Sequence, residues 1–493
     1  MESQKNTPEL NNILEKDLNT IPDKLNNIHL MGICGTAMAS LAGILKDKGY
    51  HVTGSDQNVY PPMSILLEDM GIEIKKGYSG ANLDPSPDLV IVGNVITKVN
   101  PEAVRLSELK LRYLSLPQAL KHFAIEDNKS VVIAGTHGKS TTSAICAWLL
   151  EQTGVAPGYM VGGILNNFKS SFKLGKGEYF VIEGDEYDTA FFDKGPKFLH
   201  YAPFITILTS IEFDHADIYR DLEHVVSSFR KLINIMPSGG LIIANSDDPV
   251  VFEETKKAKC QVITYGFNEN ALWRAVDIMN EDDGTFVRIL RDGKEYISFS
   301  SPLYGNHNIS NILSTVALSS FIGIPPEKVP GAIGSFRGVK RRQEIKGEEN
   351  GVLVLDDFAH HPTAVEKTIE AVKGRYKGRR LIAVFEPRSN SSRRSIFQKR
   401  YGEAFDLADL VFIPEPPLME KVPVDDRFSS ANLVEVLKGR GINAFYCNTT
   451  EQLLDMILSN ILTGDIVLIM SNGSFDNIHE KLLKKIKETQ GTK

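Results

Sequence analysis

The sequence of 493 residues has few cysteines, no excess of positive charge and no long apolar run. Its four cysteines are scattered and none shows CxxC spacing, so they indicate neither a cysteine zinc site nor a disulfide framework. The formal net charge of −7 argues against a general nucleic-acid binder. No apolar run approaches the roughly 18–20 residues of a membrane helix, and the polar N-terminus lacks the apolar core of a signal peptide. We therefore expect a globular cytoplasmic protein that binds neither nucleic acid nor membrane.

The chain is too long for a single hydrophobic core, so its length predicts several domains. We predict a polar tail over residues 1–25, followed by α/β domains over residues 26–124, 125–335 and 336–493. Alternating strand and helix patterns predict a mainly parallel sheet in each domain. A turn at residues 291–294 between two alternating runs predicts an antiparallel hairpin over residues 284–301. The other strands that we expect lie near residues 28–32, 51–56, 88–94, 131–135, 178–185, 205–211, 240–246, 352–358, 380–388, 408–416 and 465–473.

Two glycines follow the first expected strand and precede a helix, in the stretch GICG that runs from Gly32 to Gly35. Glycines at such a turn let a phosphate approach the helix N-terminus, where free N–H groups favour anions. Asp56 ends the next strand at a spacing that suits a carboxylate on a ribose hydroxyl. The full G-x-G-x-x-G pattern is absent, so a tight turn that needs glycine for packing stays an equal alternative. A dinucleotide and a UDP-sugar would both use this chemistry.

A stronger signal is the stretch VVIAGTHGKSTT, an apolar strand that runs into a glycine-lysine loop. In the common phosphate loop four residues separate the two glycines, whereas only Thr136 and His137 separate Gly135 from Gly138. A lysine and a hydroxyl at this position can neutralise phosphate charge and bind Mg²⁺. The alternative is a glycine turn with a surface lysine.

Acidic side chains follow two further expected strands. Glu183, Asp185, Glu186 and Asp188 come after one, and Glu212, Asp214 and His215 after another. In open parallel sheets, ligands bind outside the carboxyl ends of the strands. Carboxylates near a lysine loop suit Mg²⁺, which prefers oxygen ligands. A solvated acidic loop and a structural histidine remain the alternatives.

Seven stretches together resemble the Mur ligase family of peptidoglycan synthesis. They are AGTHGKSTT, EYDTAFFD, EFDHADIY, YGNHNISN, FRGVKRRQE, DDFAHHPTA and MSNGSF, in the family's order, and the resemblance covers residues 28–485. It implies three α/β domains: a Rossmann-like N-terminal domain for a UDP-sugar, a central P-loop ATPase-type domain with a parallel sheet plus a small antiparallel sheet, and a Rossmann-like C-terminal domain for a peptide. It also implies an ADP-forming carbon–nitrogen ligase that uses ATP and Mg²⁺ and proceeds through an acyl phosphate.

The resemblance implies roles for matching residues. The expected catalytic residues are Lys139, Glu183 and His215, and the expected Mg²⁺ ligands are Ser140, Glu183 and His215. The expected ATP-binding residues are Gly135, Thr136, His137, Gly138, Lys139, Ser140, Thr141, Asn306, His307, Asn308, Asn311, Arg342 and Asp357. The expected substrate-binding residues are Gly32, Gly35 and Asp56 for the UDP-sugar and His360, Arg388, Ser389 and Asn390 for the peptide.

The resemblance also bears on the two substrates. The acid would be UDP-N-acetylmuramate. The stretches GICGTAMAS, SDQNVYPPMSILLEDMGI, EYDTAFFDKGPKFLHYAP and FEPRSN favour L-alanyl-γ-D-glutamyl-meso-diaminopimelate as the amine, in cell-wall recycling, over L-alanine. Several family members carry a carbamoylated lysine that binds a second Mg²⁺, and we estimate that Arg230 occupies the matching position. An oxidoreductase that uses NAD and is fused to an NTPase domain is the alternative from another class.

Overall fold

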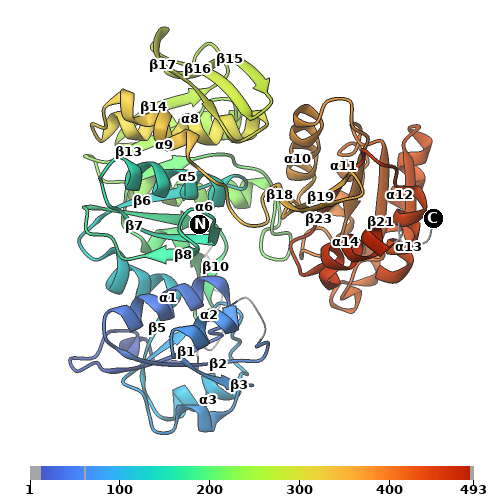
Figure 1. Ribbon diagram of the computed structural model, residues 1–493. Coiled ribbons are helices and arrows are strands. Elements are labelled where there is room, and N and C mark those ends of the chain that lie inside the picture. The colour runs from blue at the N-terminus through green and yellow to red at the C-terminus, as the bar shows by residue number, and fades with distance from the viewer. Residues whose placement is uncertain (1–12, 60–62, 489–493) are drawn as a thin grey trace, which may run out of the picture.

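The computed structural model describes residues 13–59 and 63–488, in three units (Figure 1). Residues 1–12 of the predicted tail lie outside these ranges. Residues 13–25 pack against the first unit, where Leu14 is buried and the Asn19 side chain donates to the Tyr113 carbonyl at 2.9 Å. This part of the predicted tail is therefore attached to the first domain. Over the described ranges, no helix is long and apolar enough to cross a membrane.

The first domain is a five-stranded parallel sheet in the order β3-β2-β1-β4-β5. The strand-turn-helix-strand prediction for its start is confirmed, and Gly32 has a φ of +84°, a conformation that glycine adopts without strain. Its elements are β1 (Asn27–Met31), α1 (Thr36–Asp47), β2 (His51–Asp56), α2 (Met63–Asp69), β3 (Glu73–Lys76), β4 (Leu89–Val92), α3 (Pro101–Glu108), β5 (Arg112–Ser115) and α4 (Leu116–Leu120).

The central domain contains a ten-stranded sheet in the order β17-β16-β15-β14-β13-β12-β6-β9-β7-β8. The predicted hairpin is confirmed as β16 and β17, and a further strand, β15, joins it to the parallel sheet by pairing with β16 and, through two residue pairs, with β14. The strands are β6 (Lys129–Ala134), β7 (Gly158–Leu165), β8 (Ser170–Lys173), β9 (Tyr179–Gly184), β12 (Pro203–Leu208), β13 (Leu241–Asn245), β14 (Gln261–Gly266), β15 (Trp273–Glu281), β16 (Gly284–Arg291) and β17 (Lys294–Ser301), beside a separate pair, β10 (Asp188–Ala190) and β11 (Asp193–Pro196). The helices are α5 (Lys139–Gln152), α6 (Leu222–Ile235), α7 (Pro249–Thr255), α8 (Asn306–Phe321) and α9 (Val329–Gly334).

The C-terminal domain is a six-stranded sheet in the order β18-β19-β23-β20-β21-β22, parallel except for β18. All four strands predicted here are present. Its elements are β18 (Glu344–Glu349), β19 (Val352–Asp357), α10 (Pro362–Arg375), β20 (Leu381–Phe385), α11 (Gln398–Tyr401), β21 (Leu410–Pro414), α12 (Ser430–Gly439), β22 (Asn443–Cys447), α13 (Thr450–Asn460), β23 (Ile466–Met470) and α14 (Ile478–Glu488).

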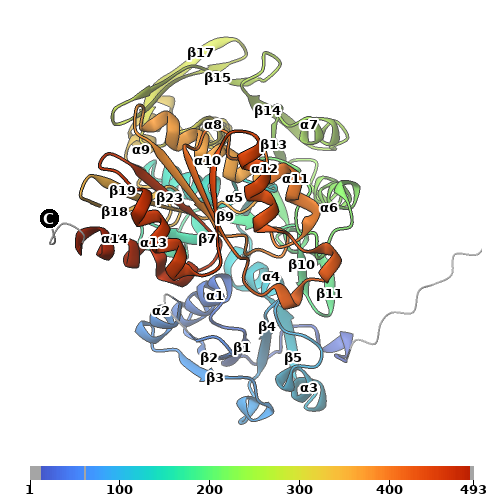
Figure 2. The same cartoon turned by 90° about the vertical axis from the view of Figure 1, so that its right-hand side faces the viewer.

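The hydrophobic cores show how the domains are joined. One core runs without a break from the first sheet into the central sheet, and Phe172 of β8 packs so closely on Gly43 of α1 that a Cβ there would lie 2.2 Å from its ring. The two faces of the C-terminal sheet have cores of their own. The first two domains therefore form one packed body. The C-terminal domain stands beside the central domain with α10 towards it (Figures 1 and 2).

Residues 336–343 connect the central and C-terminal domains. The first half of this linker is fixed on the central domain, because Arg337 N donates to Asn167 Oδ1 at 2.7 Å and Lys340 N donates to the Ile164 carbonyl at 3.0 Å. Arg341 and Gln343 have φ angles of +62° and +49°. The chain thus changes direction within residues 341–343.

Candidate active site

The loop between β6 and α5 needs both of its glycines. Gly135 has a φ of +139°, and a Cβ there would lie 2.1 Å from Thr209 Oγ1. Gly138 has a φ of +80° and caps α5, and a Cβ there would lie 2.7 Å from Asn311 Oδ1. The short loop is thus wedged between β12 and α8, and its N–H groups stand at the start of a helix, where anions are favoured.

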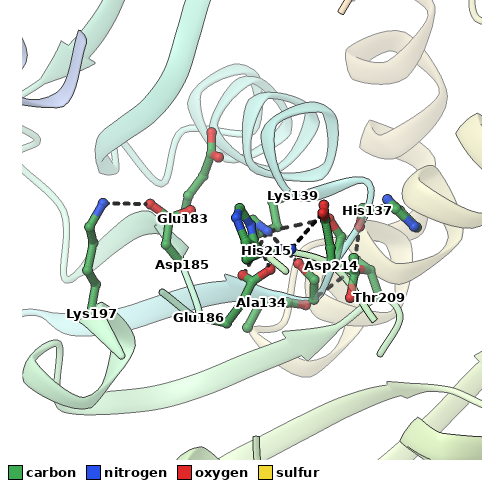
Figure 3. Close-up of polar contacts among 12 residues, drawn as sticks. Ala134, His137, Lys139, Glu183, Asp185, Glu186, Lys197, Thr209, Asp214 and His215 are labelled. Carbon is green, nitrogen blue, oxygen red and sulfur yellow. Dashed lines mark hydrogen bonds and ion pairs between the residues drawn. The ribbon is translucent and has the colours of Figure 1, made fainter. Parts of the chain in front are cut away.

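Lys139 folds back over this loop. Its ammonium donates to the Gly135 carbonyl at 2.6 Å and forms an ion pair with Glu186 at 3.0 Å (Figure 3). Burial lowers the pKa of Lys139, but the charges of Glu186 and Asp185 outweigh burial and raise it above its ordinary value. The lysine is therefore charged and held at the carboxyl end of the sheet.

Ser140 and Glu183 form a pair of oxygen donors beside the lysine. Ser140 Oγ donates to Glu183 Oε2 at 3.0 Å, and the Gly162 N–H donates to Glu183 Oε1. Burial, followed by the charge of Asp185, raises the pKa of Glu183. A hydroxyl next to a half-buried carboxylate is a donor set that suits Mg²⁺.

His215 lies near this pair but contacts a different carboxylate. Its Nε2 is 3.5 Å from Glu186 Oε1, so Glu186 links His215 to Lys139 (Figure 3). Burial lowers the pKa of His215, but the hydrogen bond and charge of Glu186 raise it above its ordinary value. Glu186, a strand-end acid that the sequence placed in the cluster without giving it a role, thus connects two of the three predicted catalytic residues, while Glu183 pairs with Ser140 at the first turn of α5.

Lys197 is a further buried cation that the sequence analysis did not single out. Its ammonium is 3.1 Å from Asp185 Oδ2 and lies 4.0 Å from the centre of the Tyr187 ring. It comes from a short 3₁₀ helix, Lys197–His200, that follows β11. The stretch EYDTAFFDKGPKFLHYAP contains this helix, but nothing in it indicates that Lys197 folds back onto Asp185.

A cavity of about 990 Å³ opens beside the loop. Its walls come from the loop, the start of α8 and the linker with β19, so two domains contribute to it. Nine of the predicted ATP-binding residues line it, namely His137, Gly138, Thr141, Asn306, His307, Asn308, Asn311, Arg342 and Asp357. Ser140 and Lys139 stand next to the lining residues in sequence, at the first turn of α5.

The polar residues of α8 have distinct surroundings. Asn308 Nδ2 donates to the Tyr304 carbonyl at 2.8 Å, which fixes the first turn, while Asn311 reaches the phosphate loop at Gly138. Burial lowers the pKa of His307 to about 4, so its ring is neutral near pH 7. A neutral ring and amides at a cavity wall can donate to and accept from a purine edge.

Asp357 and Arg342 enter the cavity from the C-terminal side. The Asp357 carboxylate accepts from Gln343 N at 2.8 Å and from Ala359 N at 2.7 Å. Burial raises the pKa of Asp357. The Arg342 guanidinium lies 5.2 Å from the centre of the Phe358 ring, within cation–π range.

The predicted UDP-sugar residues lie outside the walls of this cavity, at the carboxyl end of the first sheet. Asp56 Oδ2 accepts from Cys34 N at 2.9 Å, so the carboxylate orders the turn between Gly32 and Gly35. Asp56 Oδ1 accepts from Asn58 N at 2.9 Å. The spacing that suggested a ribose ligand is equally the spacing of a carboxylate that caps a turn.

The predicted peptide-binding residues also lie outside the cavity walls, with His360 after β19 and Arg388, Ser389 and Asn390 after β20. Asn390 donates to Asp217 Oδ2 of the central domain at 2.8 Å, and Ser389 accepts from Ser392 N at 3.0 Å. Arg388 has a weaker partner, with Nη1 at 3.4 Å from Glu386 Oε1. His360 Nδ1 is 3.0 Å from the Phe358 carbonyl. Arg388 is thus the member of this group with the most freedom to take an anionic ligand.

Arg230, near the position where some family members carry a carbamoylated lysine, lies on α6. Its Nε is 2.7 Å from Glu254 Oε2, and its guanidinium also pairs with Glu223. The hydrogen bonds that Arg230 donates to these two carboxylates raise its pKa. The arginine is therefore engaged with α6 and α7 and contacts none of the predicted metal ligands.

Comparisons with known proteins agree on one family over most of the chain. Residues 27–127 match the model described as the Mur ligase family catalytic domain, residues 133–319 the Mur ligase middle domain, and residues 341–473 the glutamate ligase domain. The chain is 41% identical to UDP-N-acetylmuramate–L-alanyl-γ-D-glutamyl-meso-2,6-diaminoheptandioate ligase of Escherichia coli, over 92% of this chain and 97% of that one. It is 32% identical to UDP-N-acetylmuramate–L-alanine ligase of Alkaliphilus metalliredigens, over 93% of this chain and 97% of that one.

Solved structures agree. A murein peptide ligase from Psychrobacter arcticus superposes with a TM-score of 0.71 and 33% identity, covering 94% of this chain and 99% of that one. An alanine ligase from Thermotoga maritima, at 23% identity, shares the fold with a TM-score of 0.77 over 94% and 99%. Family models, curated relatives and folds thus coincide over nearly the same residues, and the chain belongs to the Mur ligase family.

Proposed function

We propose that this protein is an ATP-dependent ligase that joins the lactyl carboxylate of UDP-N-acetylmuramate to the amine of L-alanyl-γ-D-glutamyl-meso-diaminopimelate. The observation that carries the proposal is the cavity that unites the short phosphate loop, the polar start of α8 and the entry into the C-terminal domain. The identity of 41% to a ligase named for this reaction supports the choice of amine.

The phosphate loop would hold ATP by its β- and γ-phosphates. The N–H groups of residues 135–141 stand at the start of α5, and Lys139 supplies a positive charge close to them. When ATP enters, its γ-phosphate can replace Glu186 as the partner of the lysine. Residues Thr136 and Thr141 add hydroxyls, and His137 adds an imidazole beside Glu212.

Ser140 and Glu183 would hold Mg²⁺, because their oxygens already lie within 3.0 Å of each other. His215 would join them, after release from Glu186. Bound Mg²⁺ would supply charge neutralisation at the phosphates. Asn306, His307, Asn308 and Asn311 would bind the adenine, and Arg342 and Asp357 the ribose and a phosphate from the opposite wall.

The two other substrates would bind at the ends of the outer sheets. The first domain would take the UDP group at the turn of Gly32 and Gly35, which Asp56 orders. The C-terminal domain would take the peptide near His360, Ser389 and Asn390. We assign a peptide carboxylate to Arg388, because a guanidinium binds a carboxylate through two parallel hydrogen bonds.

The reaction needs the carboxylate to become an electrophile. Transfer of the γ-phosphoryl group makes an acyl phosphate, the amine attacks its carbonyl carbon, and phosphate leaves. Lys139 would stabilise the negative charge that moves between the phosphates, and the two packed domains would hold the acid in line with ATP. The C-terminal domain would bring the amine to the acyl carbon.

The assay that tests the proposal is phosphate release with ATP, Mg²⁺ and UDP-N-acetylmuramate, with either the tripeptide or L-alanine added. We expect release with the tripeptide. Release with L-alanine alone would move the protein to the alanine ligases, and release with neither amine would refute the ligase assignment.

A further inference from the structure

Three metal-binding side chains meet where the C-terminal domain contacts the central domain. His137 Nε2 lies 3.2 Å from Glu212 Oε2, and His361 Nδ1 lies 3.8 Å from the same oxygen. The two imidazole rings are 4.6 Å apart, centre to centre. One ligand atom from each of the three residues can be chosen so that all lie within 4.8 Å of one another. His137 belongs to the phosphate loop, Glu212 follows β12, and His361 is the N-cap of α10.

The hydrogen bonds of His361 fix which ring nitrogen carries the lone pair. Nε2 lies 3.2 Å from the Phe213 carbonyl, an acceptor, so Nε2 bears the proton. Nδ1 accepts from Thr363 N at the long distance of 3.3 Å and faces Glu212. Metal-binding histidines usually donate their second ring N–H to a carbonyl in this way. A metal would replace the weak bond from Thr363.

The spacing of the three residues suits a tetrahedral ion. With metal–ligand distances of about 2.0–2.2 Å, neighbouring ligand atoms of a tetrahedral site lie about 3.3–3.6 Å apart. The distances of 3.2 Å and 3.8 Å to Glu212 bracket this value. Two imidazoles and one carboxylate form a ligand set of zinc sites that keep a fourth position open. The set differs from Ser140 and Glu183, whose oxygens suit Mg²⁺.

The access route also suits a cation. His137, Glu212 and Thr363 line the large cavity, which gives an ion a path and leaves its fourth position open to solvent or a phosphate oxygen.

We propose that His137, Glu212 and His361 form a binding site for a divalent transition metal of the zinc class. Because the first two ligands belong to the central domain and the third to the C-terminal domain, the bound ion joins the two domains. It adds to the direct contacts between them, which include the Thr363 hydroxyl donating to Glu212 at 2.8 Å. The site is distinct from the proposed Mg²⁺ site and does not depend on the proposed reaction.

The test uses Co²⁺ alone as the probe, added to the full chain without nucleotide. We expect one ion per chain with the strong visible spectrum of tetrahedral Co²⁺, displaced by Zn²⁺. His361→Asn should weaken binding at least tenfold, since asparagine keeps the N-cap of α10 but removes the ligand. His360→Asn is the matched control in the same turn, and Glu183→Gln removes the proposed Mg²⁺ ligand. Both should bind Co²⁺ like the wild type.

Hydrogen exchange supplies a second readout. Bound Zn²⁺ should slow exchange at residues 212–217 and 361–365 together, in the wild type but not in His361→Asn. If His361→Asn fails to fold, as judged by circular dichroism, Glu212→Gln takes its place. Equal Co²⁺ affinity in the wild type and the folded ligand variant would overturn the site. A loss of affinity in Glu183→Gln alone would place the ion with Ser140 instead.

Discussion

Replacing Lys139 with alanine separates the chemical role of the phosphate loop from its structural role. The substitution leaves Glu186, which is only 2% exposed, without its main cation. Breaking a buried ion pair costs about 3–5 kcal/mol. We expect the lower end, about 3 kcal/mol, because His215 stays 3.5 Å from Glu186. A domain of this size loses about 2–4 °C of Tm per kcal/mol, so the Tm of the central domain should fall by ~6–12 °C.

The double variant Lys139→Ala/Glu186→Gln should recover most of this loss, because no uncompensated buried charge remains. ATP turnover should be at least about 10²-fold below the wild type in both variants, since each lacks the charge that faces the phosphates. The assays are differential scanning fluorimetry and phosphate release with tripeptide. If the Tm loss of the double variant equals the sum of the losses of Lys139→Ala and Glu186→Gln, the two residues do not form a coupled pair. Near-normal turnover in Lys139→Ala would remove the loop from the mechanism.

Three further predictions follow. Gly138→Ala should raise the KM for ATP and lower the Tm more than Gly154→Ala. Both glycines have a positive φ, but only at Gly138 would the added Cβ meet a neighbouring side chain. Steady-state kinetics and fluorimetry measure the two effects. Arg388→Ala should raise the KM for tripeptide at least about tenfold, the value of one charged hydrogen-bonded contact, with the KM for ATP unchanged. Asp356 has a pKa below its ordinary value, because burial, which raises it, is outweighed by His479 and Arg341. The ionised carboxylate therefore stabilises the fold above about pH 4, and this stabilisation is lost as the pH falls further. In urea titrations between pH 5 and about pH 3, the free energy of unfolding should fall less for Asp356→Asn than for the wild type.

Each of these predictions has an outcome that contradicts it. Equal losses at the two glycines would mean that backbone strain alone is responsible. An unchanged KM for tripeptide in Arg388→Ala would move the peptide carboxylate elsewhere. Identical acid profiles for Asp356→Asn and the wild type would show that this carboxylate has the same pKa in the folded and unfolded chain.

The sequence predicted those features that depend on neighbouring residues. Apolar runs of four to six residues marked the central strands of each sheet, and the glycine-lysine loop marked the start of α5. Short, half-exposed strands such as β3 and β18 carried no such pattern, because they are stabilised mainly by pairing with a neighbour. The residues at the ends of β9 and β12 were found because the carboxyl ends of parallel strands meet at one edge.

Partner choice was beyond the sequence. The sequence placed Glu183 and Glu186 in one cluster, but only the fold shows that Ser140 bonds to Glu183 and that Lys139 pairs with Glu186. The meeting of His361 with Glu212 depends on how the C-terminal domain docks, 149 residues further along the chain by sequence number. For Asp56 the sequence spacing is ambiguous in itself, because it suits both a carboxylate that binds a ribose and a carboxylate that accepts from the turn at Cys34.

The position of the linker bend has a consequence for how far each residue travels if the C-terminal domain swings. The chain is tethered to the central domain up to Lys340, so a rotation would have its pivot within residues 341–343. Asp357 is bonded to Gln343, so its carboxylate stays close to this bend. Arg388 packs against Gly473, whose carbonyl accepts from Arg341 at 2.7 Å, so the proposed peptide site is also connected to the bend. A swing of the domain about residues 341–343 would therefore move the nucleotide contact and the proposed peptide contact together.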